Sequence, residues 1–279
     1  MADKRSHPTR RALLAGFAAS PIAVAGIGAF PRSARAQAQA AGLITPNVCM
    51  VLPEVTEGPY YFDPDMVRRD ITEDRDGIPM RLHLQVVNAD CQPVAGARVD
   101  IWHCDARGIY SGYRNTGTDI DARGETFLRG TQTTGADGVT RFDTIYPGWY
   151  RGRTTHVHYK VFLDERTVLT SQIFFPDALS EYLFQSVAPY NERGQRRDTM
   201  NGTDWIAEQA GEGAFASIRE QKSYYDAALV VGIAPAADSA RSGAAGGRGP
   251  GTDGGPPPGD NGGPSRPDRG TVFIPGPKG

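Results

Sequence analysis

The sequence predicts a mainly β protein: an antiparallel β-sandwich with short helical segments and a disordered C-terminal tail. Three observations support this fold class. Apolar residues alternate with polar ones in several short runs, Gly, Pro and Asp separate the runs, and no long helical pattern lies between them. The chain has 279 residues and a net charge of -2, which predicts one domain with appendages and argues against binding to nucleic acid.

The first expected strand starts at Arg81, because every second residue from Leu82 to Val86 is apolar. A turn at 88–90 separates it from a second strand around Val99, which polar residues and a glycine end at 105–108. Further strands are expected at 138–145, 156–163 and 168–175, and helices at 181–185 and 205–225.

Residues 1–36 have the pattern of an export signal. Basic residues that include Arg10-Arg11 precede an apolar run up to Phe30, and an Ala-Arg-Ala cleavage pattern follows at 34–36. A proline and a glycine interrupt the apolar run, so a removable signal is favoured over a membrane anchor. The paired arginines resemble a twin-arginine signal, with Sec export as the alternative. We therefore expect an exported protein, periplasmic or secreted, without a membrane span after signal removal.

Residues 45–235 form the expected folded domain, and residues 236–279 form a tail rich in Gly and Pro. The tail has too few apolar residues to offset the entropy lost on ordering, so disorder is expected. All three cysteines lie beyond the expected signal. In an oxidising compartment we favour a disulfide between Cys49 and Cys91, because Cys104 belongs to an expected strand region.

His156 and His158 are the first candidates for chemistry. Residues two apart on a strand project from the same face, so both imidazoles can reach one metal ion. This spacing also fits zinc, copper or an exposed strand without a metal. Tyr110 and Tyr150 lie at Gly-containing turns, and phenolate oxygens are hard anionic donors that suit a ferric ion. On the residues alone, both tyrosines also fit ordinary turn and edge positions.

Five sequence blocks contain or adjoin these residues. They are TEGPYY at 56–61, VDIWHCDARGIYSG at 99–112, YPGWY at 146–150, RTTHVH at 153–158 and TSQIFF at 170–175. In this order the blocks resemble the motifs of the intradiol ring-cleavage dioxygenases, the family of protocatechuate 3,4-dioxygenases and catechol 1,2-dioxygenases. The resemblance covers the chain from about Cys49 to about Val231.

The resemblance implies a non-haem Fe(III) cofactor and an oxidoreductase that cleaves catechol-type diols with O2. Cleavage between the two hydroxyl-bearing carbons would give cis,cis-muconate-type diacids. Tyr150 is implied to be the axial ligand that leaves when substrate binds, Arg153 to stabilise negative charge on the substrate, and Gln172 to hydrogen-bond near the reacting oxygens. The implied site residues are the metal ligands Tyr110, Tyr150, His156 and His158, the catalytic residues Arg153, Gln172 and Tyr150, and the substrate-binding residues Pro59 and Tyr60.

Other interpretations stay open. Residues 94–99 also resemble transthyretin-like and carboxypeptidase-regulatory β-sandwich modules, which bind partners without catalysis, and a copper or zinc enzyme is a third interpretation. We interpret His103 as a structural hydrogen-bonding residue, Cys104 as a buried thiol and His83 as solvent-exposed. In cytosolic catechol 1,2-dioxygenases a helical dimerisation region lies where this sequence has the expected export signal. A homo-oligomer and an unlike partner chain therefore both stay possible, and the sequence leaves the identity of the catechol open.

Overall fold

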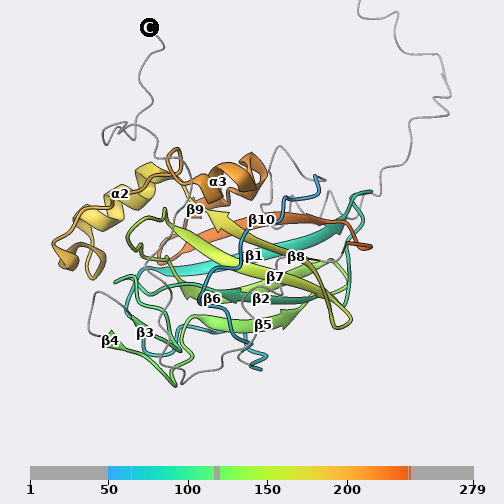
Figure 1. Cartoon of the computed structure of the whole chain (residues 1–279), viewed down its shortest axis with the longest axis horizontal. Coiled ribbons are helices and arrows are strands. Elements are labelled where there is room, and N and C mark those ends of the chain that lie inside the picture. Colours follow the sequence, from blue (N-terminus) through green and yellow to red (C-terminus); the bar gives the residue numbers. More distant parts are fainter. Residues whose placement is uncertain (1–49, 64, 116–119, 238, 240–279) are drawn as a thin grey trace, which may run out of the picture. The chain divides into compact units, whose positions relative to one another are not determined.

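The computed structural model describes residues 50–63, 65–115, 120–237 and 239. The expected export signal, Cys49 and the expected tail from 240 onward lie outside these residues. Two four-stranded β-sheets form the centre of the described part (Figure 1). The strands are β1 Pro79–Asn88, β2 Arg98–Trp102, β3 Arg114–Asn115, β4 Ile120–Asp121, β5 Arg129–Thr133, β6 Val139–Ile145, β7 His156–Leu163, β8 Arg166–Phe174, β9 Ser217–Glu220 and β10 Tyr225–Ile233. The helices are α2 Asp177–Ser186 and α3 Trp205–Ala210, with 3-10 turns η1 Tyr190–Arg193 and η2 Glu212–Ala214.

The strand order is β6-β1-β10-β9 in the first sheet, here called sheet A, and β5-β2-β7-β8 in the second, sheet B. Neighbouring strands in both sheets are antiparallel, except for β1 and β10, which are parallel. A parallel pair needs a long crossover connection, and most of the domain lies between these two strands. The predicted β-sandwich is therefore confirmed, with one parallel pair in a largely antiparallel arrangement.

The two sheets share one hydrophobic core. Leu82 and Leu84 of β1 belong to the same buried cluster as Ile101 of β2 and Val157 of β7. Side chains alternate between the two faces of a strand, so the residues on either side of Val157 point to the opposite face of sheet B, called here its outer face. The core therefore fixes the direction of both histidines in the H-x-H motif.

The helix expected at 205–225 is wrong beyond Ala210. Gly211 has a φ of 73° and ends α3, with its N–H bonded to the carbonyl oxygen of Ala207 at 3.1 Å. The chain then forms η2, β9 and β10, and alternating apolar residues from Ala227 onward fill the core side of β10. The helix expected at 181–185 is part of the longer α2. No helix of the described residues is both long and apolar enough to cross a membrane.

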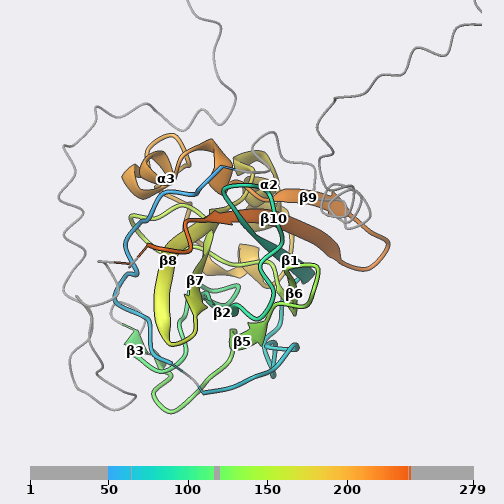
Figure 2. The same cartoon turned by 90° about the vertical axis from the view of Figure 1, so that its right-hand side faces the viewer.

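Residues 51–63, called here the cover segment, begin beside β10 of sheet A, where Val51 forms a bridge with Gly232, and then cross the outer face of sheet B. Figure 2 shows this blue segment running past β8 towards β3. The N–H of Val55 donates to the carbonyl of Thr170 on β8 at 3.0 Å, and Arg129 Nη1 on β5 donates to the carbonyl of Tyr60 at 2.6 Å. The cover segment therefore reaches both edge strands of sheet B and excludes water from side chains between them.

Candidate metal centre

The register of sheet B sets four side chains in one row under the cover segment. Arg129, Trp102, His158 and Gln172 are partners across β5, β2, β7 and β8. The His158 ring is stacked on Trp102, with ring centroids 4.8 Å apart and planes 9° from parallel. Since His156 is two residues along the same strand, both imidazoles lie on one face, as the sequence predicted.

Three donor atoms lie around Nε2 of His156. His158 Nε2 is 3.0 Å away, Tyr150 Oη 3.2 Å and Tyr110 Oη 3.5 Å. His156 Nδ1 lies 2.6 Å from the carbonyl oxygen of Thr154, so Nδ1 is the nitrogen that carries the hydrogen and Nε2 keeps its lone pair. The structure therefore brings together all the residues predicted as metal ligands.

Burial controls the protonation of these groups. It raises the pKa of the Tyr110 phenol well above its usual value. It also raises the pKa of the Tyr150 phenol, although the charge of Arg153 opposes part of that increase. Burial lowers the pKa of both imidazoles well below the usual value. The charge of Arg153 lowers the pKa of His156 further, and the neighbouring His156 lowers that of His158 further. Neutral imidazoles are the form that binds metal, and a cation stabilises phenolates that would otherwise stay protonated. This donor set fits a ferric ion.

Two adjoining turns position the tyrosines. The turn that leads to Tyr110 is closed by Asp105, whose Oδ1 accepts the N–H of Ile109 at 2.9 Å. Gly148 lies against this turn so closely that a Cβ at its position would be 2.3 Å from the carbonyl oxygen of Asp105. Only glycine permits this approach, which brings the Pro-Gly-Trp-Tyr turn, and with it Tyr150, next to Tyr110.

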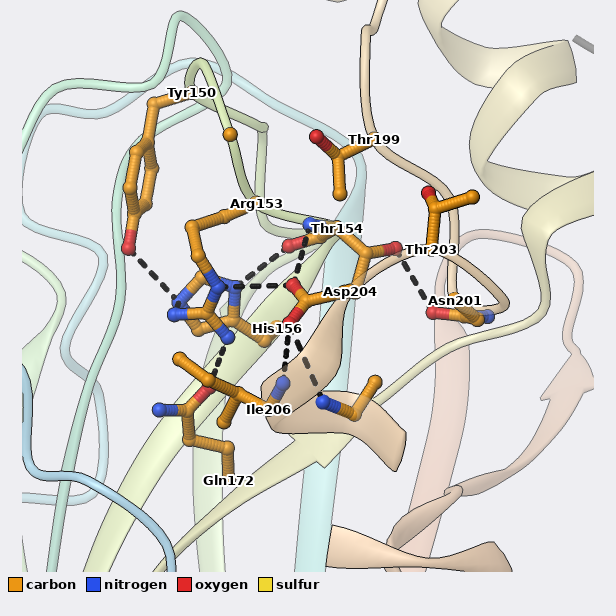
Figure 3. Close-up of polar contacts among 12 residues, drawn as sticks. Tyr150, Arg153, Thr154, His156, Gln172, Thr199, Asn201, Thr203, Asp204 and Ile206 are labelled. Atoms are coloured by element: carbon orange, nitrogen blue, oxygen red, sulfur yellow. Dashed lines mark hydrogen bonds and ion pairs between the residues drawn. The ribbon is translucent and has the colours of Figure 1, made fainter. Parts of the chain in front are cut away.

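Arg153 and Gln172 lie beside the donor atoms, as predicted. Arg153 Nη2 donates to Gln172 Oε1 at 2.5 Å, and Arg153 Nη1 lies 3.5 Å from His156 Nε2 (Figure 3). Gln172 Nε2 in turn donates to the carbonyl of Thr56 in the cover segment at 3.0 Å. The guanidinium therefore lies within reach of a molecule bound at the histidines.

The predicted pocket residues lie in the cover segment. The Tyr60 ring is stacked on the Tyr110 ring, with centroids 4.2 Å apart, and it stands edge-on to Tyr150 at 6.0 Å. Pro59 is exposed next to it. A Cβ at Gly58 would lie 3.2 Å from Cε1 of His158, so the turn carrying these residues rests directly on that imidazole. Tyr60 thus forms one wall of the metal centre.

Three buried charged residues at the centre were missed by the sequence interpretation. Arg129 lies on β5, a strand that lacks the apolar alternation by which β1 was found. Its guanidinium donates to Ser111 Oγ at 2.9 Å and to the Ser111 carbonyl at 2.8 Å. Lys160 pairs with Glu57 and lies 4.0 Å above the ring of Tyr61. Asp204 accepts Arg153 Nε at 2.9 Å, and the only signal for it in the sequence is an acid just before an expected helix.

The remaining histidines and cysteines do not belong to the set of four donor groups. His103 is buried, with Nδ1 2.8 Å from the carbonyl of Cys104 and Nε2 2.7 Å from Thr144 Oγ1, which confirms a structural role. Cys104 is a buried free thiol, as predicted. Cys91 is disulfide-bonded, and the predicted partner Cys49 lies outside the described residues. The prediction for His83 is wrong, because its side chain is only 16% exposed and Nε2 lies 2.9 Å from Asp226 Oδ1.

Comparison with known proteins identifies relatives of this chain. Residues 56–194 match the family model described as Dioxygenase. The chain is 34% identical over 143 residues to catechol 1,2-dioxygenase 1 of Acinetobacter lwoffii, a match to 43% of this chain and 45% of that protein. It is 30% identical over 191 residues to catechol 1,2-dioxygenase of Acinetobacter baylyi, a match to 60% of each protein. The chain thus spans about half the length of the curated relatives that it matches.

A solved structure extends this similarity to the fold. The intradiol ring-cleavage dioxygenase from Tetranychus urticae is 35% identical and superposes with a TM-score of 0.64, covering 69% of this chain and 98% of that one. Sequence and fold therefore agree over nearly the whole length of that protein. This chain belongs to the intradiol ring-cleavage dioxygenase family.

Proposed function

We propose that this chain is a non-haem Fe(III) dioxygenase that uses O2 to cleave catechol-type diols between their hydroxyl-bearing carbons, yielding cis,cis-muconate-type diacids. One observation carries the proposal: two phenol oxygens and His158 Nε2 lie within 3.5 Å of His156 Nε2. Membership of the family supports it, and so do the names of the catechol 1,2-dioxygenases that this chain resembles.

The four ligand side chains have distinct tasks. His156 and His158 would hold the ion through Nε2, and Tyr110 and Tyr150 through their phenolate oxygens. When bound there, Fe(III) supplies a Lewis acid that withdraws electron density from a catecholate and makes its ring reactive towards O2. The cover segment keeps water away from this chemistry.

Tyr150 is the better candidate for the ligand that gives way to substrate. Its side chain is only partly buried, whereas Tyr110 is 1% exposed and is held by the stacked ring of Tyr60. The N–H of Tyr110 also donates to Asn115 Oδ1 at 3.1 Å. A phenolate at Tyr150 Oη can accept a proton from a catechol hydroxyl as it moves aside, and its raised pKa favours this transfer.

Arg153 and Gln172 act on the organic substrate. Arg153 Nη1 faces the region of the histidine nitrogens and can stabilise negative charge that develops on a catechol oxygen. Gln172 fixes the guanidinium through Oε1. The alternative of a non-catalytic binding module would need neither this pair nor the meeting of the four donor groups, so these features favour the dioxygenase.

A visible absorption and EPR spectrum of the purified chain tests the proposal. We expect high-spin Fe(III) and a phenolate-to-iron charge-transfer band that shifts when catechol is added without oxygen. Oxygen uptake and muconate formation should then follow on aeration. A colourless protein that takes up no iron on reconstitution would contradict the proposal, and a protein that instead binds zinc or copper would favour the other metal interpretation.

We also propose that the chain acts outside the cytoplasm after twin-arginine export. The basic start, apolar run and cleavage pattern within residues 1–36 support this. Replacing Arg10-Arg11 by two lysines should leave the uncleaved precursor in the cytoplasm of the expressing cell. Normal export of that variant would favour the Sec route.

A further inference from the structure

Asp204 is a buried carboxylate to which the proposed reaction assigns no task. It is 3% exposed and occupies the N-cap position of α3. Its Oδ1 accepts the N–H groups of Ile206 at 2.9 Å and Ala207 at 3.3 Å. Its Oδ2 accepts Arg153 Nε and the N–H of Thr154, both at 2.9 Å (Figure 3). One carboxylate therefore joins the start of α3 to the candidate metal centre.

Two anchors fix the guanidinium of Arg153. Nε is bonded to Asp204, and Nη2 is bonded to Gln172 Oε1 at 2.5 Å. The guanidinium is planar and rigid, so bonds at two of its nitrogens set the direction of the third. That third nitrogen, Nη1, lies 3.5 Å from His156 Nε2. Asp204 on one side and Gln172 on the other thus direct Nη1 towards the metal centre.

The same carboxylate reaches His156 through the backbone. Asp204 Oδ2 holds the N–H of Thr154, and the carbonyl oxygen of Thr154 lies 2.6 Å from His156 Nδ1. A bond at Nδ1 orients the imidazole and sets which nitrogen is free for a metal. Movement of the loop at Thr154 would therefore disturb the arginine and the histidine together.

Asp204 also balances a buried charge. Arg153 is 6% exposed, and burial disfavours its charge, whereas the Asp204 carboxylate oxygen 2.9 Å from Nε stabilises that charge. A buried cation without its acid would oppose a metal cation at the nearby histidines. The ion pair removes much of that opposition and leaves Nη1 able to donate a hydrogen bond.

We propose that Asp204 is a positioning residue that fixes the direction and balances the charge of Arg153, so that Nη1 meets the negative charge developing on a bound catechol. The part that concerns the substrate rests on the proposed function. The placement of Arg153 by Asp204 holds for the chain with or without a metal.

The variants must separate this role from simple capping of α3. Asp204→Asn keeps a good N-cap residue of nearly the same shape but removes the charge that faces Arg153. Thr203→Val is the matched control. Thr203 belongs to the same turn, and its Oγ1 accepts the N–H of Met200 at 3.0 Å, on the exposed side of that turn. It therefore reports disturbance of the turn without disturbance of the ion pair.

We expect Asp204→Asn to lower kcat on catechol by about 100-fold, because the group that stabilises charge is displaced. Iron affinity should fall by about tenfold, because the buried charge of Arg153 is then left unbalanced beside the metal cation. Adding Arg153→Met to Asp204→Asn should restore iron affinity, and kcat should be no lower than in Arg153→Met alone. Thr203→Val should resemble the wild type. Additive losses in the double variant, or the same losses in Thr203→Val, would overturn the proposal.

A second measurement needs neither iron nor substrate. In an arginine-labelled NMR spectrum of the metal-free chain, Arg153 Nε–H should exchange slowly because it is bonded to a buried carboxylate. The signal, assigned by its loss in Arg153→Met, should persist in Thr203→Val and vanish in Asp204→Asn. If the signal behaves so while iron and catechol fail to bind, the proposed function is wrong and the positioning role stands. A signal unchanged in Asp204→Asn would refute that role.

Discussion

The outer faces of the two sheets carry a similar alternation of side chains, but their charged and imidazole side chains are buried to different degrees. His156, His158 and Lys160 on β7 are each at most 3% exposed beneath the cover segment. On the outer face of sheet A, the side chains of Arg81 and His83 on β1 keep 49% and 16% of their surface exposed. Burial therefore distinguishes these two sets of side chains, although a strand pattern read from the sequence is the same for both, and further along β1 the outer-face residue Gln85 is itself only 1% exposed.

The cover segment changes what polar residues on sheet B must do. Water cannot satisfy their charges or hydrogen bonds, so each needs a partner within the protein. Lys160 forms an ion pair with Glu57, and Arg129 donates to the backbone at Tyr60. Arg153, in the loop just before β7, forms an ion pair with Asp204. A face built in this way holds its groups in fixed directions, which a metal site requires and a solvated face does not provide.

Removal of a ligand should have the largest effect. In His158→Ala we expect the chain to lose its iron and its charge-transfer band, because loss of even an outer-shell partner costs about 10–100-fold in metal affinity. His83→Ala on the outer face of sheet A should retain the iron content of the wild type. Tyr150→Phe should keep more iron than His158→Ala while its turnover slows. Iron analysis and spectra of the purified variants check this, and equal loss from Tyr150→Phe and His158→Ala would contradict a displaceable Tyr150.

Arginines on the two faces should differ in their contribution to stability. Arg129→Met leaves the buried carbonyls of Tyr60 and Ser111 without donors, which should lower the free energy of unfolding by roughly 3–5 kcal/mol. The control Arg81→Met removes an exposed group 3.6 Å from Asp143, a surface pair worth about 0–1 kcal/mol. Urea unfolding at pH 7.5 measures both. Similar losses in the two variants would show that burial of the sheet B face adds nothing to the role of Arg129.

His103 provides a pH-dependent test in the interior, away from both outer faces. Burial lowers its pKa from 6.5 to about 4, so below pH 6.5 the unfolded chain binds a proton that the folded chain does not. The free energy of unfolding should therefore fall as the pH falls from 6.5 towards 4, by about 3 kcal/mol in total. Above pH 6.5 His103 should cause no loss. Urea unfolding of the wild type and His103→Asn at pH 7.5 and 4.5 isolates this contribution, since the other titrating groups are shared. Equal slopes in both proteins would exclude it.

The sequence predicted the parts of the fold and site that local patterns encode. Alternation revealed β1 and β7, and family motifs gave the metal ligands, Arg153 and Gln172. Arg129 was missed because β5 has no apolar alternation, and its partners lie far away in the chain. Asp204 was missed because its bond to Arg153 joins residues 51 apart, a relation that only the folded chain creates. The helix expected after 210 was wrong because tertiary packing at β10 outweighed weak local helix propensity.

The smallest effect is expected at His83 on the outer face of sheet A. His83 Nε2 lies 2.9 Å from Asp226 Oδ1 on the neighbouring strand, where water reaches both side chains. His83→Asn should therefore lower the free energy of unfolding at pH 7.5 by about 1 kcal/mol or less, the usual net contribution of one hydrogen bond. Iron content and catechol turnover should equal those of the wild type. A loss of stability in urea as large as that of Arg129→Met would show that His83 is as dependent on its partner as the residues beneath the cover segment, and the contrast between the two positions would then disappear.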